Sequence, residues 1–161
     1  MEHLFWVIPE KLAGRPGPQK HEWNLASLRR GGVGAVLSVN NGSLCDREDF
    51  EAHDIQYACV PLSSNEPPLP GDDDICMAAL PKAYDFVVGQ MAEGRAVLVH
   101  CTAGKDRTGL FLCYYLVRSA GSTPKDAIHS VRQVRPTALS ALGWEEFAEQ
   151  LLTKIADTGD A

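Results

Sequence analysis

The sequence contains no apolar run that approaches the ~20 residues of a membrane-spanning helix. Residues 1 to 9 have neither the basic start nor the long apolar stretch of a secretory signal peptide. The 161 residues are 45% hydrophobic and 22% charged, which is typical of a globular protein. We therefore expect a single domain over residues 1–161, with no membrane span and with a cytoplasmic location.

The cysteines fit no common framework in either number or spacing. The five cysteines are odd in number and no two of them form a C-x-x-C pair. This pattern argues against a disulfide framework and against a zinc site, so we expect no bound metal and no cofactor. A reducing compartment would keep the thiols free. The five are Cys45, Cys59, Cys76, Cys101 and Cys113.

Positive charge is also in deficit, because 15 Lys and Arg face 21 Asp and Glu, for a net charge of −6. An acidic protein of this kind is not expected to bind nucleic acid. The charge is nevertheless uneven along the chain. Residues 46–94 carry eleven acidic and two basic side chains, whereas residues 104–135 carry six basic and two acidic ones. The basic segment would suit an anionic substrate.

Strand-like and helix-like segments alternate along the chain. Apolar runs bounded by turn residues predict strands over 5–8, 33–39, 55–62 and 96–100. Capping residues and glycine stops predict helices over 22–30, 46–53, 72–93, 107–120, 123–134 and 143–156. This alternation predicts an α/β fold: a central, mostly parallel sheet of four to five strands, flanked by helices.

Proline and glycine mark three places where regular structure is not expected. Residues 14–18 contain two glycines and two prolines, which predict a turn. Residues 63–71 contain three prolines and predict an irregular loop. Pro81 lies inside the helix predicted over 72–93 and indicates a kink or a split there.

The most informative segment is residues 100–109, His-Cys-Thr-Ala-Gly-Lys-Asp-Arg-Thr-Gly. It places Cys101 and Arg107 six positions apart, between a predicted buried strand and a predicted helix. Backbone N–H groups at a helix start bind anions, and the helix dipole adds to the attraction. The segment is therefore predicted to hold a phosphate-sized anion against a thiol, as a cysteine-dependent phosphatase does.

Each residue type in this segment suits that chemistry. A thiol near a helix start and a cation is favoured as the thiolate, so Cys101 can attack phosphorus and form a phosphocysteine. The planar guanidinium of Arg107 matches two phosphoryl oxygens. Gly104 permits an unusual backbone angle close to the anion. The hydroxyl of Thr108 can donate to the thiolate or cap the following helix.

At these residues the sequence resembles the protein tyrosine phosphatase superfamily, and within it the small dual-specificity-like phosphatases. The likeness extends to residues 6–14, 28–39 and 131–136, the last of which ends in Arg-x-x-Arg-Pro. The resemblance implies a dual-specificity phosphatase-like fold, with Cys101 as nucleophile and with support of the thiolate by His100 and Thr108. The phosphate-binding residues that it implies are Thr102, Ala103, Gly104, Lys105, Asp106 and Arg107.

One departure from the family pattern concerns the general acid. The family carries an aspartate on the loop after the third strand, and Ser64 stands at that place here. A serine hydroxyl is a poor proton donor to a leaving oxygen, so another carboxyl group must serve. We favour Asp106, because some relatives with Cys-x-x-Gly-x-Asp-Arg loops are thought to use this aspartate. The alternatives are Glu66, Asp72, Asp73 and Asp74.

The substrate implied is a phosphoprotein or phosphopeptide, with phosphotyrosine first and phosphoserine and phosphothreonine behind it. Lys105 also resembles a lysine in the loops of phosphoinositide phosphatases, where a cation can pair with a second phosphate. A phosphoinositide is therefore an alternative substrate. The absence of the usual acid leaves a third hypothesis, a catalytically weak pseudophosphatase that binds phosphate.

Overall fold

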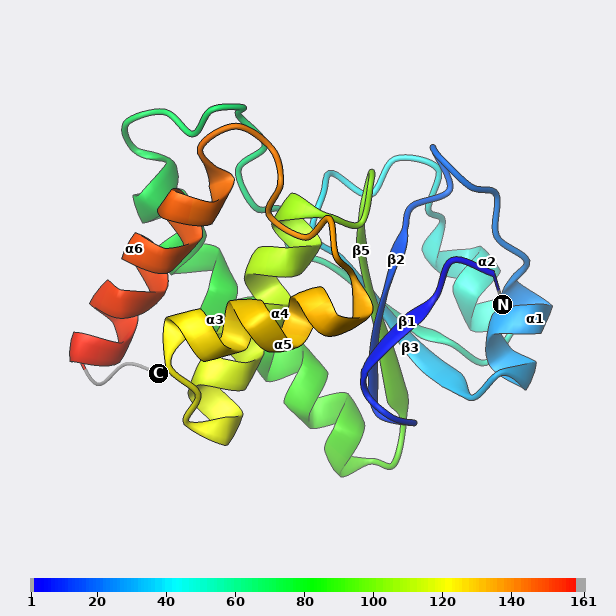
Figure 1. Cartoon of the computed structure of the whole chain (residues 1–161). Helices are drawn as coiled ribbons and strands as arrows, with labels where there is room; N and C mark the ends of the chain where they lie inside the picture. The colour runs from blue at the N-terminus through cyan, green and yellow to red at the C-terminus, as the bar shows by residue number, and fades with distance from the viewer. Residues whose placement is uncertain (1, 159–161) are drawn as a thin grey trace.

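A computed structural model describes residues 2–158, which form one central sheet with helices on both faces (Figure 1). The spatial order of the strands is β1-β2-β5-β3-β4, and only the β1–β2 pair is antiparallel. The sheet confirms the predicted α/β fold with a mostly parallel sheet. The strands are β1 Phe5–Ile8, β2 Leu12–Pro16, β3 Val33–Ser38, β4 Gln56–Cys59 and β5 Ala96–Cys101.

The helices divide unequally between the two faces of the sheet. Helices α1 and α2 pack on one face and helices α3 to α6 on the other (Figure 1). Asn24 and Asp46 cap the two short helices, and Thr123 caps α5. The helices are α1 Leu25–Arg30, α2 Arg47–Ala52, α3 Asp72–Ala92, α4 Asp106–Ala120, α5 Pro124–Val134 and α6 Trp144–Thr158.

Strand β2 corrects the prediction of a turn over residues 14–18. It pairs with β1 on one side and with β5 on the other. β1 reaches only as far as Gly14, so the missing N–H of Pro16 costs no bond to that strand. The guanidinium of Arg15 is buried and donates to the backbone oxygens of Glu2, Pro16, His21 and Glu22. Tertiary pairing therefore overrides the local turn signal.

Pro81 does not split the helix that contains it. Helix α3 is continuous from Asp72 to Ala92, with Pro81 near its middle. The buried positions Leu80, Ala83 and Val87 pack this helix on the sheet and on α4. We infer that tertiary packing keeps the helix continuous at the proline, so the predicted split is wrong and the predicted kink stays a prediction.

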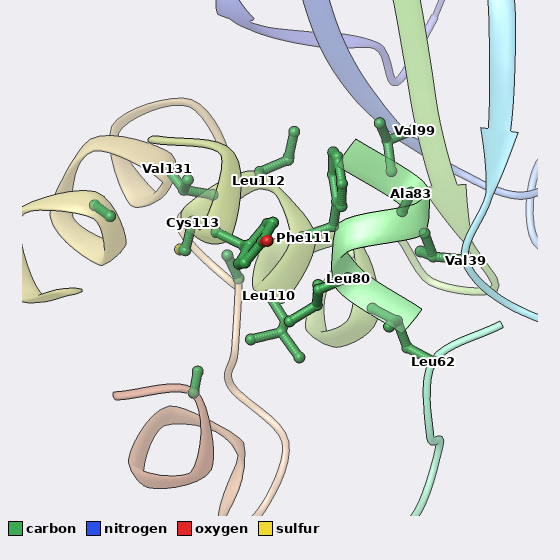
Figure 2. Packing of buried hydrophobic residues seen from close by; sticks show 14 of the residues in the cluster. Val39, Leu62, Leu80, Ala83, Val99, Leu110, Phe111, Leu112, Cys113 and Val131 are labelled. Carbon is green, nitrogen blue, oxygen red and sulfur yellow. The ribbon is translucent and has the colours of Figure 1, made fainter. Parts of the chain in front are cut away.

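Strand β5 lies at the centre of the sheet, and all six of its residues are buried. Side chains of the sheet and of helices α3 to α6 form the larger of the two hydrophobic clusters, part of which is drawn in Figure 2. This core fixes the end of β5 and the start of α4. The ends of the loop between them are therefore held by buried structure on both sides.

The parallel strands β2, β3, β4 and β5 end at the same edge of the sheet. The segments that follow them, including residues 17–24 and 60–71, gather around the end of β5 at Cys101. In open α/β sheets this edge is where ligands bind. Within residues 2–158, no helix has both the length and the hydropathy of a membrane span.

Candidate active site

The loop between β5 and α4 is built as the sequence predicts. β5 ends at the buried Cys101, residues 102–105 form the loop, and α4 begins at Asp106. Lys105 occupies the N-cap position and makes no side-chain cap hydrogen bond. The first N–H groups of α4 are thus left without the partner that a Ser, Thr, Asn or Asp cap would supply.

The first two carbonyl groups of the loop are held by donors outside it. The oxygen of Cys101 accepts from His100 Nδ1 at 3.0 Å. The oxygen of Thr102 accepts from the backbone N–H of Gly17, also at 3.0 Å, which follows strand β2. Both carbonyl groups are therefore fixed in direction by neighbouring elements.

The next three carbonyl groups are held by the segment that follows helix α5. Arg135 donates from one terminal nitrogen to Ala103 O at 2.8 Å and from Nε to Gly104 O at 3.2 Å. The backbone N–H of Leu139 donates to Lys105 O at 3.2 Å. Five consecutive carbonyl groups, from residue 101 to residue 105, are thus each bound by a donor.

This arrangement determines where the N–H groups of the loop point. In a trans peptide unit the C=O and N–H groups lie on opposite sides. Since the carbonyl groups of residues 101–105 are turned toward their donors, the N–H groups of residues 102–106 are turned away from them. No hydrogen bond within the described part of the chain uses those five N–H groups. Together with the dipole of α4, they suit an anion.

Two glycines allow the close approach that this geometry needs. Gly104 has a φ of +69°, and a Cβ there would lie 2.7 Å from backbone atoms of Arg15 and Pro16. A Cβ on Gly17 would lie 2.4 Å from Cys101 O. Both positions bring strand β2 and the loop into backbone contact, which only glycine permits.

A cavity of about 480 Å³ lies over the loop. It brings together most of the residues singled out from the sequence, and it adds Lys20 and Trp144 from two other segments. No local pattern indicated Lys20, because its position depends on where β2 ends beside β5. The lining residues are Lys20, Ser64, Glu66, Cys101, Thr102, Ala103, Lys105, Asp106, Arg107 and Trp144.

Arg107 lies in the first turn of α4, beside the thiol-bearing loop. One terminal nitrogen of its guanidinium lies 3.5 Å from Thr102 Oγ1, a long contact, and Asn40 Nδ2 approaches the same oxygen at 3.4 Å. Such weak contacts leave the guanidinium N–H groups available to an anion. Arg107 can therefore engage phosphoryl oxygens without first breaking an ion pair.

Asp106 opens helix α4 and lines the same cavity. Its Oδ1 accepts a hydrogen bond from the backbone N–H of Ala141 at 3.2 Å. Partial burial raises the pKa of Asp106, and the nearby Glu66 adds to the rise, although the bond from Ala141 and the charge of Lys105 oppose it. A carboxyl group with a raised pKa is suited to donate a proton.

Asp72 takes a structural position instead. Its buried carboxylate accepts from Ser63 Oγ at 2.6 Å, from Asn65 Nδ2 and from the N–H of Leu69 at 2.7 Å. These hydrogen bonds, Ser63 first, lower the pKa of Asp72. The group is thus held as a carboxylate that pins the loop over residues 63–71.

The two aspartates after Asp72 do not enter the cavity over Cys101. Asp73 lines a different cavity, between the loop over residues 63–71 and helix α6. Asp74 is exposed in the first turn of α3. Of the alternative acids considered from the sequence, the cavity over the thiol contains only Glu66.

The loop that carries Ser64 and Glu66 is attached to the start of helix α6. Trp144 is buried at the first position of that helix and donates from Nε1 to Asn65 O at 2.9 Å. Trp144 therefore packs in the core, and it also fixes the loop that borders the cavity. Ser64 lies in the cavity wall, where the family's aspartate was expected.

His100 is fully buried behind the thiol. Since Cys101 O can only accept, His100 Nδ1 carries the proton, and Nε2 accepts from Ser38 Oγ at 2.6 Å. Tyr57 in turn donates to Ser38 at 2.7 Å. Burial lowers the pKa of His100 to about 4, and the charges of Arg15 and Arg107 contribute. The ring is therefore neutral and orients the peptide of Cys101.

Thr108 does not cap helix α4, one of the two roles that the sequence allowed. It lies inside that helix, fully buried, and its Oγ1 has no hydrogen-bond partner within residues 2–158. Burying an unpaired hydroxyl is costly. The other expected role, donation to the thiolate of Cys101, stays a prediction.

Groups that could hold a metal ion are not found in the described residues. No cluster of three or more His, Cys, Asp or Glu side chains occurs within residues 2–158. The cysteines are all free, and Cys76 and Cys113 are buried. The functional groups that the structure assembles at the loop are a thiol, a guanidinium, two carboxyl groups and two lysines.

The family model described as "Dual specificity phosphatase, catalytic domain" matches residues 18–154. The chain is 29% identical over 126 residues to human "Dual specificity protein phosphatase 16", covering 75% of this chain and 17% of that protein. It is 32% identical over 83 residues to "Phosphatidylglycerophosphate phosphatase PTPMT1" of Arabidopsis thaliana, covering 51% of this chain and 25% of that protein.

Solved structures share the fold at low sequence identity. "Tk-PTP in the active form" superposes with a TM-score of 0.76 at 20% identity, covering 96% of this chain and 99% of that one. "PTPMT1 in complex with PI(5)P" superposes with a TM-score of 0.75 at 17% identity, covering 98% and 99%. Likeness at this level of identity shows the arrangement of helices and strands.

Proposed function

Because the chain belongs to the dual specificity phosphatase family, we propose that it is a cysteine-dependent phosphomonoester hydrolase. Its proposed substrates are phosphotyrosine, and phosphoserine and phosphothreonine, in proteins. The observation that carries the proposal is the loop over residues 101–107. Five of its carbonyl groups are bound from outside, so five N–H groups are left for an anion beside Cys101 and Arg107.

In the first step, the thiolate sulfur of Cys101 attacks phosphorus. An S–P bond forms while the P–O bond to the leaving group breaks. Arg107 and the N–H groups of the loop carry the charge on the three equatorial oxygens. The leaving oxygen takes a proton from a carboxylic acid, which becomes a carboxylate. The product at this stage is a phosphocysteine and a free alcohol or phenol.

In the second step, water attacks the phosphocysteine. The new O–P bond forms while the S–P bond breaks, which releases inorganic phosphate and restores the thiolate. The carboxylate formed in the first step accepts a proton from the water. The side chains involved thus return to their starting states, and no metal or cofactor takes part in the proposed reaction.

We assign the proton transfer to Asp106. Asp106 lies in the cavity with the thiol, its carboxyl is oriented by Ala141, and partial burial raises its pKa. Asp72 is occupied by its three donors, and Asp73 and Asp74 lie outside this cavity. Glu66 remains the alternative, since it also lines the cavity.

A phosphoinositide or related phospholipid headgroup is the second candidate substrate. Lys20 and Lys105 both line the cavity and come from different segments, so a second anionic group near the reacting phosphate would meet two cations. Two Arabidopsis thaliana relatives named as phosphatidylglycerophosphate phosphatases add to this candidate. The chain spans only a quarter of one of them, and the substrate is therefore part of the proposal.

The free cysteines support a proposed location in the cytoplasm. All five are unpaired, and a nucleophilic thiol at Cys101 needs reducing conditions.

The proposal is tested by release of inorganic phosphate from three substrate sets: phosphotyrosine peptides, phosphoserine and phosphothreonine peptides, and phosphoinositides. We expect turnover that survives EDTA, is blocked by vanadate and disappears in Cys101→Ser. The relative kcat/KM of the sets decides between protein and lipid. Tight binding of phosphate without turnover on any set would overturn the proposal in favour of a pseudophosphatase.

A further inference from the structure

Arg135 occupies the C-cap position of helix α5, more than 25 residues after the phosphate-binding loop. Its guanidinium donates to two consecutive carbonyl groups of that loop, Ala103 O and Gly104 O. We propose that Arg135 is a positioning residue, which holds the two central peptide units of the loop in their anion-binding orientation. This inference rests on the proposed function, since it concerns the same loop.

The two central peptide units depend on Arg135 more than the others do. The carbonyl groups at either end of the loop are held from elements that are themselves fixed: His100 in strand β5, Gly17 after β2 and Leu139 after α5. For Ala103 O and Gly104 O, the described residues provide no donor other than Arg135. Removing this side chain would therefore leave both carbonyl groups unpaired.

The same two peptide units are the ones most free to rotate. Both include Gly104, which has a φ of +69° and no Cβ to restrict its backbone. Five N–H groups gathered on one side of a short loop also repel one another when no anion is bound. A rotation that turns a carbonyl oxygen into the cavity would relieve this repulsion, and it would remove an N–H donor from the anion.

The guanidinium is held in place from its other side. Its central carbon lies 5.7 Å from the centroid of the Phe5 ring, in strand β1. Phe5 is itself buried. With the ring on one side and the two carbonyl oxygens as acceptors, the planar group is fixed in one orientation, so its two N–H directions are fixed as well.

The chemistry requires arginine at this position. A guanidinium presents N–H donors in a rigid fork that can reach two neighbouring acceptors at once. A lysine ammonium would keep the positive charge, but it is a compact point donor without that fork. Replacing arginine by lysine at position 135 therefore separates two explanations. If Arg135 acts only through its charge, lysine should replace it; if it acts by orienting two peptides, lysine should fail.

The test compares Arg135→Lys and Arg135→Met with a matched control, Arg118→Met. Arg118 donates one side-chain hydrogen bond, to Tyr114, where Arg135 donates two. Like Arg135 it lies over an aromatic ring, that of Tyr84, but it is near the end of α4 that is far from the loop. Affinity for inorganic phosphate is measured by titration calorimetry, vanadate inhibition by aryl phosphate turnover, and folding by thermal unfolding of each variant.

We expect both Arg135 variants to bind phosphate and vanadate at least about tenfold more weakly than the parent, with a fall in kcat/KM of similar size. We expect Arg118→Met to keep the parent's phosphate affinity. The lysine variant retains the charge and keeps the test decisive if the methionine variant does not fold. Parent-like phosphate affinity in folded Arg135→Lys would overturn the inference.

The measurements also separate this inference from the proposed function. If the parent itself neither binds phosphate nor hydrolyses a phosphomonoester, the proposed function fails and the effect of Arg135 on it has no meaning. If the parent binds and hydrolyses but both Arg135 variants match it, only the role of Arg135 is wrong. A loss of thermal stability with unchanged anion affinity would show a merely structural arginine.

Discussion

Asp106 Oδ1 accepts a hydrogen bond from the backbone N–H of Ala141 at 3.2 Å. This bond ties the first residue of α4 to the segment between α5 and α6, and it engages one carboxyl oxygen of Asp106. Within residues 2–158 no hydrogen bond engages the other oxygen, so it can carry a proton at the edge of the cavity that contains Cys101. The burial that raises the pKa of Asp106 favours the protonated form.

The assignment of Asp106 as general acid predicts an effect that depends on the leaving group. Asp106→Asn should lower kcat/KM, which reports on the leaving-group step and not on hydrolysis of the phosphocysteine, by roughly 10²- to 10⁴-fold for alkyl phosphates, whose leaving oxygens need a proton. For p-nitrophenyl phosphate, a good leaving group, the loss should be much smaller. Steady-state kinetics on both substrates measure the difference.

Glu66→Gln is the matched control for Asp106, because Glu66 lines the same cavity. We expect it to change both rates by a similar, small factor. Equal losses on alkyl and aryl phosphates in Asp106→Asn would contradict the assignment. A leaving-group-dependent loss in Glu66→Gln would transfer the role to that residue.

The unpaired hydroxyl of Thr108 predicts opposite effects on stability and activity. Thr108→Val removes a buried hydroxyl that has no partner within residues 2–158, so the unfolding free energy should rise by about 1–3 kcal/mol. If this hydroxyl serves the thiolate of Cys101, kcat should fall at the same time. Chemical denaturation and turnover are measured on the same preparation. A variant that gains stability and keeps full activity would exclude the role in catalysis.

From the lowered pKa of His100 we predict that the free energy of unfolding falls on mild acidification. Its folded pKa of about 4 lies below the ordinary value of 6.5, so between these two pH values the unfolded chain binds the extra proton. Stability should therefore fall as the pH drops from 6.5 to 4, by up to about 3 kcal/mol from this group. Urea unfolding at intervals across this range, on the parent and on His100→Gln, gives the contribution of His100. Identical slopes for the two proteins would show that His100 does not cause the loss.

From the lowered pKa of Asp72 we predict a further fall in the free energy of unfolding, in a more acidic range. Hydrogen bonds from Ser63, Leu69 and Asn65 lower the pKa of this carboxyl group below its unfolded value of about 3.8. Its stabilising effect is therefore present above that value, and it is lost as the pH falls through the folded pKa. At neutral pH, Asp72→Asn should cost about 2–3 kcal/mol of unfolding free energy.

Asp74→Asn controls for the loss of one negative charge in the same helix turn, because Asp74 is exposed. Its unfolding free energy should stay within about 0.5 kcal/mol of the parent. The difference between Asp72→Asn and the parent should shrink below pH 4. A difference that stays constant with pH would show that the carboxylate charge is not the cause.

Gly104 predicts a loss of phosphate binding when a single methyl group is added. A Cβ there would lie 2.7 Å from backbone atoms of Arg15 and Pro16, at a φ that disfavours other residues. Gly104→Ala must therefore shift the loop, and we expect at least about tenfold weaker phosphate affinity.

Gly89→Ala is the control: Gly89 lies in α3 with nothing within 4 Å of its Cβ position. It should be stabilising by about 0.5–1 kcal/mol. Parent-like phosphate affinity in Gly104→Ala would contradict this account of the loop.

Much of the fold and the centre of the site follow from local sequence. The alternation of apolar runs and capped helices predicted the mostly parallel sheet, which the structure confirms. The strand, loop and helix around Cys101 and Arg107 follow from residues 96–120 alone, because a buried strand, a glycine and a helix start are all local features. The resemblance to the phosphatase family, and not the local pattern, put Ser64 at the place of the usual aspartate, and Ser64 does line the cavity over the loop.

Tertiary structure decided the rest, because long-range contacts have no local signal. Arg15 lies in strand β2, although its glycine and proline neighbours predict a turn. The reason is that β5 pairs with this strand along its whole length and β1 pairs with its first residues. Asp72 became a buried anchor for the loop through donors from Ser63 to Leu69. Two carbonyl groups of the loop, Ala103 O and Gly104 O, are bound by Arg135, which the sequence places more than 30 residues away. Residue type determined the chemistry of the loop, and the carbonyl partners brought by folding determined which way its N–H groups face.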